Sequence, residues 1–351
     1  MKVLMIHVGN ELATYDAAKP EFYLHRKSML DGRLKTFLKH DIINADSQMQ
    51  SLMAKGVDIE YGHFSDRRSF RSLIKAGRRI RRICKEERIE LVHVLWGTTA
   101  ALITIFFSPR PVVISFCGSD LLGTKNEFGH LTKGGKINRM FSKIAARFAT
   151  QIITKSEHMR SLLPQKIQAK TTVIPNGVDL SGFYPMPLAE SKEKLGWDTT
   201  KKHILFFYTE GQVVKNPKMA LKVMELVNQE IPQAEMVIAT KIPHEQLLHY
   251  YNASDVMILT SFHEGSNNSL KEAIACNLPV VSVNVGDAKE RLGHLVACYV
   301  MDTFDPLLFK EKVVRVLNSG ARSNGVNSST EVSIEYMAEK VIAVYKKVLA
   351  K

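Results

Sequence analysis

The sequence has few cysteines and no long apolar run. Its four cysteines, Cys84, Cys117, Cys276 and Cys298, are scattered, and no two of them form a C-x-x-C pair. A zinc knuckle is therefore not expected, and the pattern is typical of a reduced cytoplasmic protein. No stretch of about 18 apolar residues occurs, so the sequence predicts no transmembrane helix. Its 351 residues, 45% of them hydrophobic, are enough for two globular domains.

Two glycine-rich nucleotide-binding motifs are also missing. No G-x-G-x-x-G follows the first strand expected in either half of the chain. No G-x-x-x-x-G-K-[ST] occurs anywhere. A dinucleotide-dependent dehydrogenase and a P-loop phosphotransferase therefore both lose their main support.

Positive charge is abundant and concentrated. The net charge is +13, which implies an acidic partner such as nucleic acid, an anionic membrane surface or a phosphorylated substrate. Residues 67–88, RRSFRSLIKAGRRIRRICKEER, carry ten Arg or Lys against two Glu. Apolar residues recur there every three or four positions, which predicts an amphipathic helix. Its basic face is either simply solvated or in contact with anionic lipid head groups. Nucleic acid is not expected, because no aromatic residues alternate with the charges.

The first half of the chain alternates between strand-like and helix-like segments. Strands are expected at 2–8, 56–64, 91–97, 111–120, 149–156 and 170–179. Helices are expected at 22–39 and 67–88, with a helix or buried segment at 99–107. Continuous apolar strands alternating with helices predict an α/β fold with a parallel, doubly wound sheet.

After residue 180 the pattern breaks and then starts again. A linker with one short helix precedes strands at 203–211, 234–240, 255–261 and 279–285, with helices at 216–231, 245–254 and 269–276. A last amphipathic helix covers 332–351. We expect a first Rossmann-like domain at 1–180, a second at 181–330, and a C-terminal helix at 331–351 that packs back toward the first. Ligands of such sheets bind beyond the carboxyl ends of the strands, so the expected site is a cleft between the two domains.

The stretch HEGSNNSLKEAIACNLPVVSVNVGD, residues 263–287, holds Glu264 and Glu272 on either side of small polar residues. Four of those residues suit a helix N-cap, and a helix N-terminus suits a phosphate. The two acids are too far apart to act as a carboxylate pair. They could flank an extended ligand with phosphate at its middle, one acid near a sugar and the other near a ribose. Alternatively, they only favour the helix N-terminus electrostatically.

This stretch resembles the Glu-x7-Glu segment of retaining glycosyltransferases with two Rossmann-like domains, the large family four that includes sucrose synthase and mannosyltransferases. VIPNGVDLSGFYP, KNPKMAL, the SEHM segment at 156–159 and the closing helix with Tyr345 also resemble that family, in family order. The resemblance implies the B-type fold, in which the two domains face each other across a cleft. It also implies transfer of a sugar from a nucleotide-diphosphate sugar to a glycan or lipid-linked acceptor, in synthesis of cell-surface polysaccharide or lipopolysaccharide. The basic helix at 67–88 would then place a cytoplasmic enzyme on the inner membrane face.

The resemblance also assigns roles in the second domain. Glu264 would contact hydroxyls of the transferred sugar, and Glu272 would bind the ribose. Lys215 would bind the diphosphate and neutralise the leaving group, so that no metal and no cofactor are expected; a solvated surface lysine is the plain alternative. The backbone around five small residues would hold phosphate and sugar; these are Gly265, Ser266, Asn267, Asn268 and Ser269.

Three residues of the first domain resemble family positions. Gly118, in SFCGSD, would allow close approach of the donor sugar. Asp120 would contact the acceptor or the sugar, or would cap the next helix instead. Asn176 would lie at the cleft between the domains, or would only form an Asn-Gly turn.

Four departures from the family pattern bear on activity. Glu210 stands where many relatives have an arginine, and a carboxylate there would repel a diphosphate unless it points away. Cys117 replaces a frequent histidine, and Lys241 begins a segment that replaces a glycine-rich turn. The glycine loop after the first strand is absent. A non-catalytic relative that binds a nucleotide sugar or a glycan is therefore the main alternative, and an epimerase-like or phosphorylase-like enzyme is a weaker one.

Overall fold

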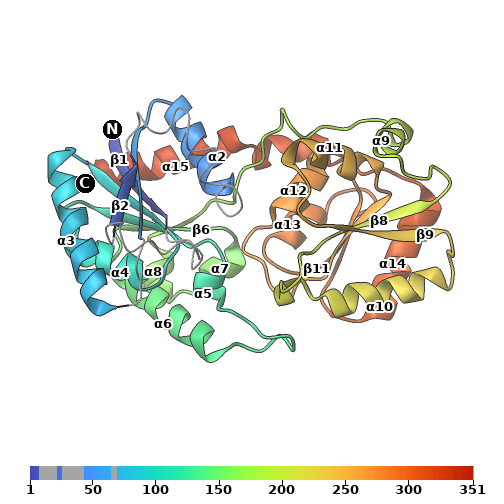
Figure 1. Ribbon diagram of the computed structural model, residues 1–351, viewed down its shortest axis with the longest axis horizontal. Helices are drawn as coiled ribbons and strands as arrows, with labels where there is room; N and C mark the ends of the chain where they lie inside the picture. The colour runs from blue at the N-terminus through green and yellow to red at the C-terminus, as the bar shows by residue number, and fades with distance from the viewer. Residues whose placement is uncertain (8–21, 26–42, 65–68, 351) are drawn as a thin grey trace. The chain divides into compact units, whose positions relative to one another are not determined.

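The computed structural model describes residues 1–7, 22–25, 43–64 and 69–350. The chain forms two compact α/β units (Figure 1). Unit 1 contains Met1–Thr124, Leu131–Asn176 and Ile334–Lys351, and unit 2 contains Lys125–His130 and Gly177–Ser333. The sequence placed the boundaries at residues 180 and 330, and the contacts place them after Asn176 and after Ser333.

The sheet of unit 1 has the strand order β2-β3-β1-β4-β5-β6-β7. All of its strands pair in parallel except β2, which runs antiparallel to β3 at the edge. The strands are β1 (Lys2–His7), β2 (Phe22–His25), β3 (Asp58–Phe64), β4 (Leu91–Leu95), β5 (Val112–Ser115), β6 (Gln151–Thr154) and β7 (Thr171–Val173). The predicted doubly wound parallel sheet is confirmed, apart from its antiparallel edge.

The helix expected over 22–39 is wrong at its beginning. Phe22–His25 is the edge strand β2, and its first residues, Phe22 and Tyr23, are aromatic β-formers. Pairing with β3 outweighs the weak helical pattern there. The rest of that expected helix lies outside the described residues.

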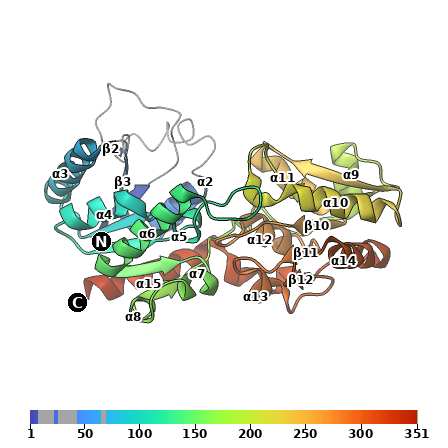
Figure 2. The same ribbon diagram turned by 90° about the horizontal axis from the view of Figure 1, so that it is seen from below.

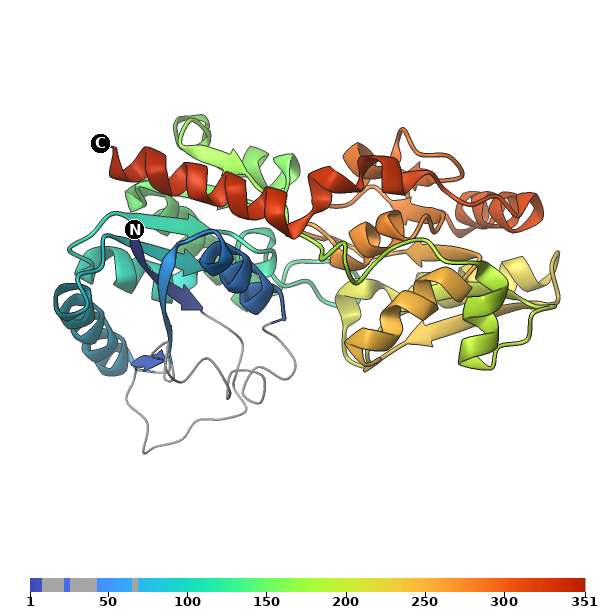
Figure 3. The same cartoon turned by 90° about the horizontal axis from the view of Figure 1, so that it is seen from above.

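Two helical layers cover the two faces of this sheet. One layer consists of α3 (Phe70–Glu86), α4 (Thr98–Phe107) and α6 (Lys133–Phe148), which follow one another on one face (Figure 2). The other consists of α2 (Ile43–Ala54) and α15 (Ile334–Leu349), which pack together on the opposite face (Figure 3). Three short helices, α5 (Ser119–Leu122), α7 (Glu157–Ser161) and α8 (Gln165–Gln168), follow strands β5 and β6.

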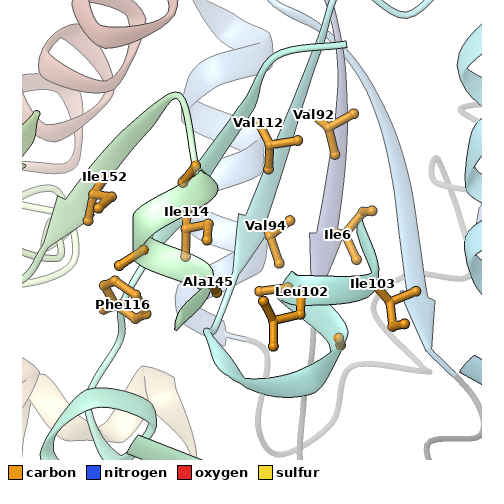
Figure 4. Close-up of a cluster of buried hydrophobic side chains, with 14 of the residues drawn as sticks. Ile6, Val92, Val94, Leu102, Ile103, Val112, Ile114, Phe116, Ala145 and Ile152 are labelled. Atoms are coloured by element: carbon orange, nitrogen blue, oxygen red, sulfur yellow. The ribbon is translucent and has the colours of Figure 1, made fainter. Parts of the chain in front are cut away.

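Alternate residues of each central strand enter opposite cores. In β4, Val92 and Val94 pack in the first layer, whereas Leu91 and Leu95 pack in the second. Figure 4 shows part of the first core, where the sheet residues lie against Leu102 of α4 and Ala145 of α6. Because both faces are covered, the central strands read as continuous apolar runs.

A buried histidine joins the closing helix to the sheet. His93 of β4 shares hydrogen bonds with the Tyr345 hydroxyl at 2.5 Å and with Ser115 Oγ at 2.7 Å. Burial, aided by the nearby charge of Lys155, lowers the pKa of His93 to about 3. The neutral ring therefore bridges α15 to β4 and β5 at ordinary pH.

This histidine predicts an acid-sensitive unit 1. An unfolded histidine has a pKa of about 6.5, so between about pH 6.5 and pH 3 only the unfolded state binds the proton. The stability of unit 1 should fall as pH falls through this window, by up to about 1.4 kcal/mol per pH unit from this group. Trp96 and Trp197 are the two tryptophans, one in each unit, so Trp96 fluorescence in a Trp197→Phe background follows unit 1 during urea unfolding. His93→Gln should flatten the pH dependence; an unchanged slope would refute this assignment.

Unit 2 has an all-parallel sheet in the order β12-β11-β10-β8-β9. Its strands are β8 (Lys202–Phe207), β9 (Ala234–Ala239), β10 (Val256–Leu259), β11 (Val280–Val283) and β12 (Tyr299–Met301). On one face α10 (Pro217–Asn228) packs with α14 (Pro306–Ser319), and on the other face lie α11 (His244–Ala253) and α12 (Asn268–Ala275) (Figure 1). Two shorter helices, α9 (Leu188–Leu195) and α13 (Ala288–Leu292), complete the unit.

Candidate functional site

The topology of unit 2 brings Lys215 and Glu264 together. Strands β8 and β10 are parallel neighbours, so the loops after them leave the same edge of the sheet. Lys215 ends a short 3₁₀ turn after β8, and Glu264 lies in the loop after β10. The Thr260 hydroxyl donates to the Lys215 carbonyl at 2.8 Å and ties the two loops together. Lys215 Nζ then lies 2.8 Å from Glu264 Oε1.

Glu264 is held as a carboxylate in this partly buried ion pair. Burial opposes its ionisation, but the charge and hydrogen bond of Lys215 outweigh burial, with help from Ser261 and Asn267, and the pKa of Glu264 is lowered. The Ser261 hydroxyl donates to the same Oε1 at 2.7 Å. An ammonium group has three N–H donors, and Glu264 accepts from one of them, so Lys215 retains donors for an anionic ligand.

The loop of small residues ends at a capped helix. Asn267 is the N-cap of α12, and its Oδ1 accepts from the Leu270 N–H at 2.9 Å. Gly286 packs under the loop with φ +61°, where an added Cβ would stand 3.0 Å from the Gly265 carbonyl. The loop backbone is therefore fixed closely against the β11–α13 connection.

The Ser266 side chain belongs to this support. Its hydroxyl donates to Asp287 Oδ2 at 2.9 Å and accepts from the buried Lys271 ammonium at 2.9 Å. Arg291 also contacts Asp287. The Ser266 hydroxyl therefore anchors the turn, and the predicted backbone contact with a ligand stays a prediction.

Glu272 has a different environment from Glu264. It is the fifth residue of α12, past the first turn of the helix. The fully buried Tyr251 of α11 donates its hydroxyl to Glu272 Oε2 at 2.5 Å. Burial raises the pKa of Glu272, against the hydrogen bond from Tyr251. Two acids with opposite pKa shifts are more typical of two separate tasks than of one charge effect on a helix end.

Asn268 and Ser269 are the first two residues of α12, Asn267 is its N-cap, and Gly265 and Ser266 come directly before the cap. All five small residues therefore lie at or next to the N-terminus of α12. Glu210 is exposed in the loop after β8, and Lys241 adopts a positive φ of 52° after β9. A left-handed conformation favours glycine, so a lysine is an unusual residue at this position.

In unit 1, Asp120 organises the loop that contains Gly118. Its carboxylate is 1% exposed and accepts from the N–H groups of Gly118 at 2.8 Å, Leu121 at 3.0 Å and Gly97 at 2.8 Å, and from that of Cys117 at 3.2 Å. Burial raises its pKa, while these N–H groups act in the opposite direction. The suggestion that Asp120 caps the next helix is wrong, because Gly118 holds the N-cap position of α5.

Gly118 is open on the side that a side chain would occupy. No atom lies within 4 Å of where its Cβ would stand, so a ligand can approach this backbone. The neighbouring loop after β4 has left-handed backbone at Trp96, with φ 84°, and at Thr98, with φ 73°. Such strain at the carboxyl edge of a parallel sheet is typical of a binding site. Asn176 is the last residue of unit 1, at the point where the chain passes to unit 2.

Two residues of the candidate site, Lys155 and Tyr251, were not predicted from the sequence. Lys155 follows β6, is 2% exposed, and forms no hydrogen bond or ion pair within the described residues. Burial lowers its pKa, against the charge of Asp120. Burial also raises the pKa of the neighbouring Cys117 thiol to about 12, so the thiol is neutral. A lysine near the end of the buried run ATQIITKS was a usable sequence signal for Lys155. The contact of Tyr251 with Glu272 depends on tertiary structure, so the sequence contained no signal for it.

Within residues 1–7, 22–25, 43–64 and 69–350, no three His, Cys, Asp or Glu side chains gather as a metal ion would require. The helices of this same part of the chain include none whose length and apolar character would let it cross a bilayer.

Two family models match the chain. The model described as Glycosyltransferase Family 4 matches residues 25–181, and the model described as Glycosyl transferases group 1 matches residues 215–319. A D-inositol 3-phosphate glycosyltransferase of Thermobispora bispora is 23% identical over 213 residues, which cover 51% of this chain and 49% of that protein. This chain thus spans about half the length of the first such relatives. An uncharacterized glycosyltransferase of Methanocaldococcus jannaschii is 22% identical over 93% of each chain.

Solved structures share the fold at low identity. Sucrose-phosphate synthase from Thermosynechococcus elongatus has a TM-score of 0.74 and 15% identity over 99% of each chain. The Anabaena protein HepE in complex with UDP-glucose has a TM-score of 0.63 and 15% identity, covering 99% of this chain and all of that one. These likenesses confirm the predicted fold of two Rossmann-like, parallel-sheet domains.

Proposed function

This chain belongs to the glycosyltransferases of family 4, group 1, and we propose that it transfers a sugar with retention of anomeric configuration from a nucleotide-diphosphate sugar to a glycan or lipid-linked acceptor. The observation that carries the proposal is the Lys215–Glu264 ion pair beside the N-terminus of α12, with Glu272 further along the same helix.

Lys215 and the N-terminus of α12 receive the diphosphate. The ammonium and the N-terminus of α12 oppose the charge that develops on the leaving group. Glu264 holds Lys215 in place in the free enzyme, and accepts hydrogen bonds from sugar hydroxyls when the donor binds. Glu272, oriented by Tyr251, accepts from the ribose hydroxyls. These residues supply the charge that a metal would otherwise supply, so the proposal includes no metal and no cofactor.

The bond between the sugar and the diphosphate oxygen then breaks, so that the sugar becomes cation-like and the diphosphate leaves from one of its faces. The acceptor hydroxyl attacks from that same face, and the departing diphosphate takes its proton. In unit 1, the open backbone at Gly118 receives the donor sugar, with Asn176 as a further donor contact. Asp120 fixes the loop through its four N–H bonds.

Lys155 replaces the positive charge that Cys117 cannot supply. Lys155→Met should lower turnover by about tenfold to a hundredfold, since the positive charge beside the Cys117–Asp120 loop of unit 1 is lost. The same change should raise the stability of unit 1, because burying an ammonium group that has no hydrogen bond within the described residues is costly. Lys166→Met, at an exposed lysine of α8, is the control. Full turnover in Lys155→Met, or a loss of stability that accounts for the loss of turnover, would make Lys155 a structural residue.

We propose that the acceptor belongs to the synthesis of cell-surface polysaccharide or lipopolysaccharide. In this proposal the transfer takes place in the cytoplasm at the inner membrane face, and the basic helix 67–88 contacts anionic lipid. A Bacillus subtilis relative, 23% identical over 58% of this chain, is named for teichuronic acid biosynthesis. Of the basic helix, Arg67 and Arg68 lie outside the described residues, and α3 carries the remaining basic residues up to Lys85, with Arg88 just beyond its end.

The test is release of nucleoside diphosphate from UDP-, GDP- and ADP-sugars in the presence of EDTA, followed by NMR of the anomeric proton in the product. The proposal expects one donor class to turn over and an α-linked donor to give an α-linked product. A product with inverted anomeric configuration would contradict the proposed retention, and loss of turnover in EDTA would contradict metal independence. No turnover of any donor would favour the non-catalytic alternative, which Glu210 and Cys117 support.

A further inference from the structure

Helix α6 of unit 1 carries large apolar side chains on its solvent side. Gly135, Ser142, Ala145 and Ala146 form its buried face. On the outside, Ile137 and Met140 are each 51% exposed and Phe148 is 56% exposed. Phe106 of α4 is 64% exposed and lies beside Phe148, with ring centroids 5.6 Å apart. Exposed apolar groups gathered on one surface indicate a binding face.

The same helix carries only positive charge. Its sequence KGGKINRMFSKIAARF contains no acid and five basic residues, Lys133, Lys136, Arg139, Lys143 and Arg147. In the part of the chain that the structure describes, none of these five forms an ion pair. Burial lowers the pKa of Lys143, and the nearby charge of Arg139 lowers it further. A cluster of cations that repel one another, with no carboxylate partner among the described residues, is suited to a polyanionic surface.

A groove of about 480 Å³ runs along this face. It is lined by Lys136, Arg139, Met140, Lys143, Ile144, Arg147 and Pro164. Four cations thus surround a partly apolar hollow, with exposed apolar side chains near it. Phosphate groups fit the cations, and hydrocarbon next to those phosphates fits the apolar side chains.

We propose that the groove along α6 binds the phosphate head groups of an anionic phospholipid bilayer, and that Ile137, Met140, Phe106 and Phe148 enter the boundary between head groups and acyl chains. The choice of a bilayer as the partner of this groove rests on the proposed function, because a lipid-linked acceptor is found in a bilayer. The groove itself rests on the charges and exposure of α6 alone.

This surface differs from the basic helix α3. The apolar residues of α3, including Leu73, Ile80 and Ile83, are buried in the core, so α3 offers the membrane charges and one exposed aromatic, Phe70. Helix α6 offers charges together with a cluster of apolar groups. Because α3, α4 and α6 belong to one layer, both helices can meet the same surface (Figure 2).

The test is co-sedimentation of the full chain with phosphatidylcholine vesicles, with and without phosphatidylglycerol. Lys136→Glu with Arg147→Glu should weaken binding to the anionic vesicles by about thirtyfold or more, at about 1 kcal/mol per basic residue. The matched control is Lys346→Glu with Lys347→Glu, the same charge change at exposed positions of α15, in the opposite layer of unit 1. A third variant, Ile137→Ser with Met140→Ser, should lose the part of the binding that survives at high salt.

Three results would overturn the proposal. One is equal binding by the α6 and α15 charge variants. Another is loss of binding only when Arg78, Arg79, Arg81 and Arg82 of α3 are changed to Glu, which would assign the membrane contact to α3. The third is unchanged binding in the serine variant together with complete competition by soluble polyphosphate, which would make the groove a site for a free anion. The assay needs no turnover, so its failure is distinct from failure of the proposed reaction.

Discussion

Replacing Lys215 by alanine is expected to reduce turnover of the sugar donor by about a hundredfold to a thousandfold. Lys215 is the cation that meets the leaving diphosphate, and its Nζ lies 2.8 Å from Glu264 Oε1 in the free enzyme. Its loss removes a charge that matters most when the leaving group becomes more negative. It also leaves Glu264 partly buried without its cation, so the pKa of Glu264 should rise.

The matched control is Lys218→Ala, three residues further on. Lys218 pairs with the exposed Glu127 at 2.9 Å and is itself largely exposed, so its loss should leave turnover nearly unchanged. In Lys215→Ala the loss should appear mainly in kcat rather than KM, since the interaction strengthens in the transition state. A rise in KM with kcat unchanged would reduce Lys215 to a ground-state contact, and equal effects of the two substitutions would remove it from the site.

Asp120→Ala is expected to destabilise unit 1 by about 3 kcal/mol or more. The carboxylate accepts from four backbone N–H groups, of which those of Gly97 and Leu121 are buried. Without it these donors lose a partner, although Leu121 N–H keeps a bond to the Gly118 carbonyl. Asp120→Asn keeps one oxygen and should lose about half as much stability.

Urea unfolding followed by Trp96 fluorescence in the Trp197→Phe background measures this change. Asp58→Ala, at an exposed aspartate of the same unit, is the control and should change stability by less than about 0.5 kcal/mol. If Asp120→Ala is as stable as Asp58→Ala but loses all turnover, Asp120 acts on the ligand directly, as the sequence resemblance implied, and does not act by holding the loop.

The fold was readable where strands are buried on both faces. Val92, Val94, Val281 and their neighbours form continuous apolar runs because helices cover both sides of each sheet. Elements at the edge or surface were harder. Helix α6 was missed although its apolar residues recur every three or four positions, because it opens with Lys-Gly-Gly, and glycine disfavours a helix. Strand β12 and helix α14 were missed after the last clear strand, and β2 was taken as helix because pairing with β3 is a tertiary effect.

The part of the site that lies on one continuous segment of the chain could be predicted from the sequence. The turn at Gly265–Ser269 and its helix follow from N-cap chemistry, and the structure selects Asn267 from the four candidates. The meeting of Lys215 with Glu264 depends on β8 lying next to β10, an order that no local pattern contains. The Tyr251–Glu272 contact likewise joins two helices. Asp120 was recognised as important, but its four N–H partners come from two loops.

Calorimetric titration of UDP, GDP and ADP into the wild-type protein and Glu272→Ala tests the central claim most directly, with Glu290→Ala, an exposed acid of α13, as control. The account predicts that one nucleotide binds the wild type and the control equally. It predicts that Glu272→Ala binds that nucleotide about ten- to a hundredfold more weakly, the value of a charged hydrogen bond to a ribose hydroxyl. Absence of binding by all three nucleotides, or equal affinity in Glu272→Ala, would contradict a nucleotide-sugar site at α12.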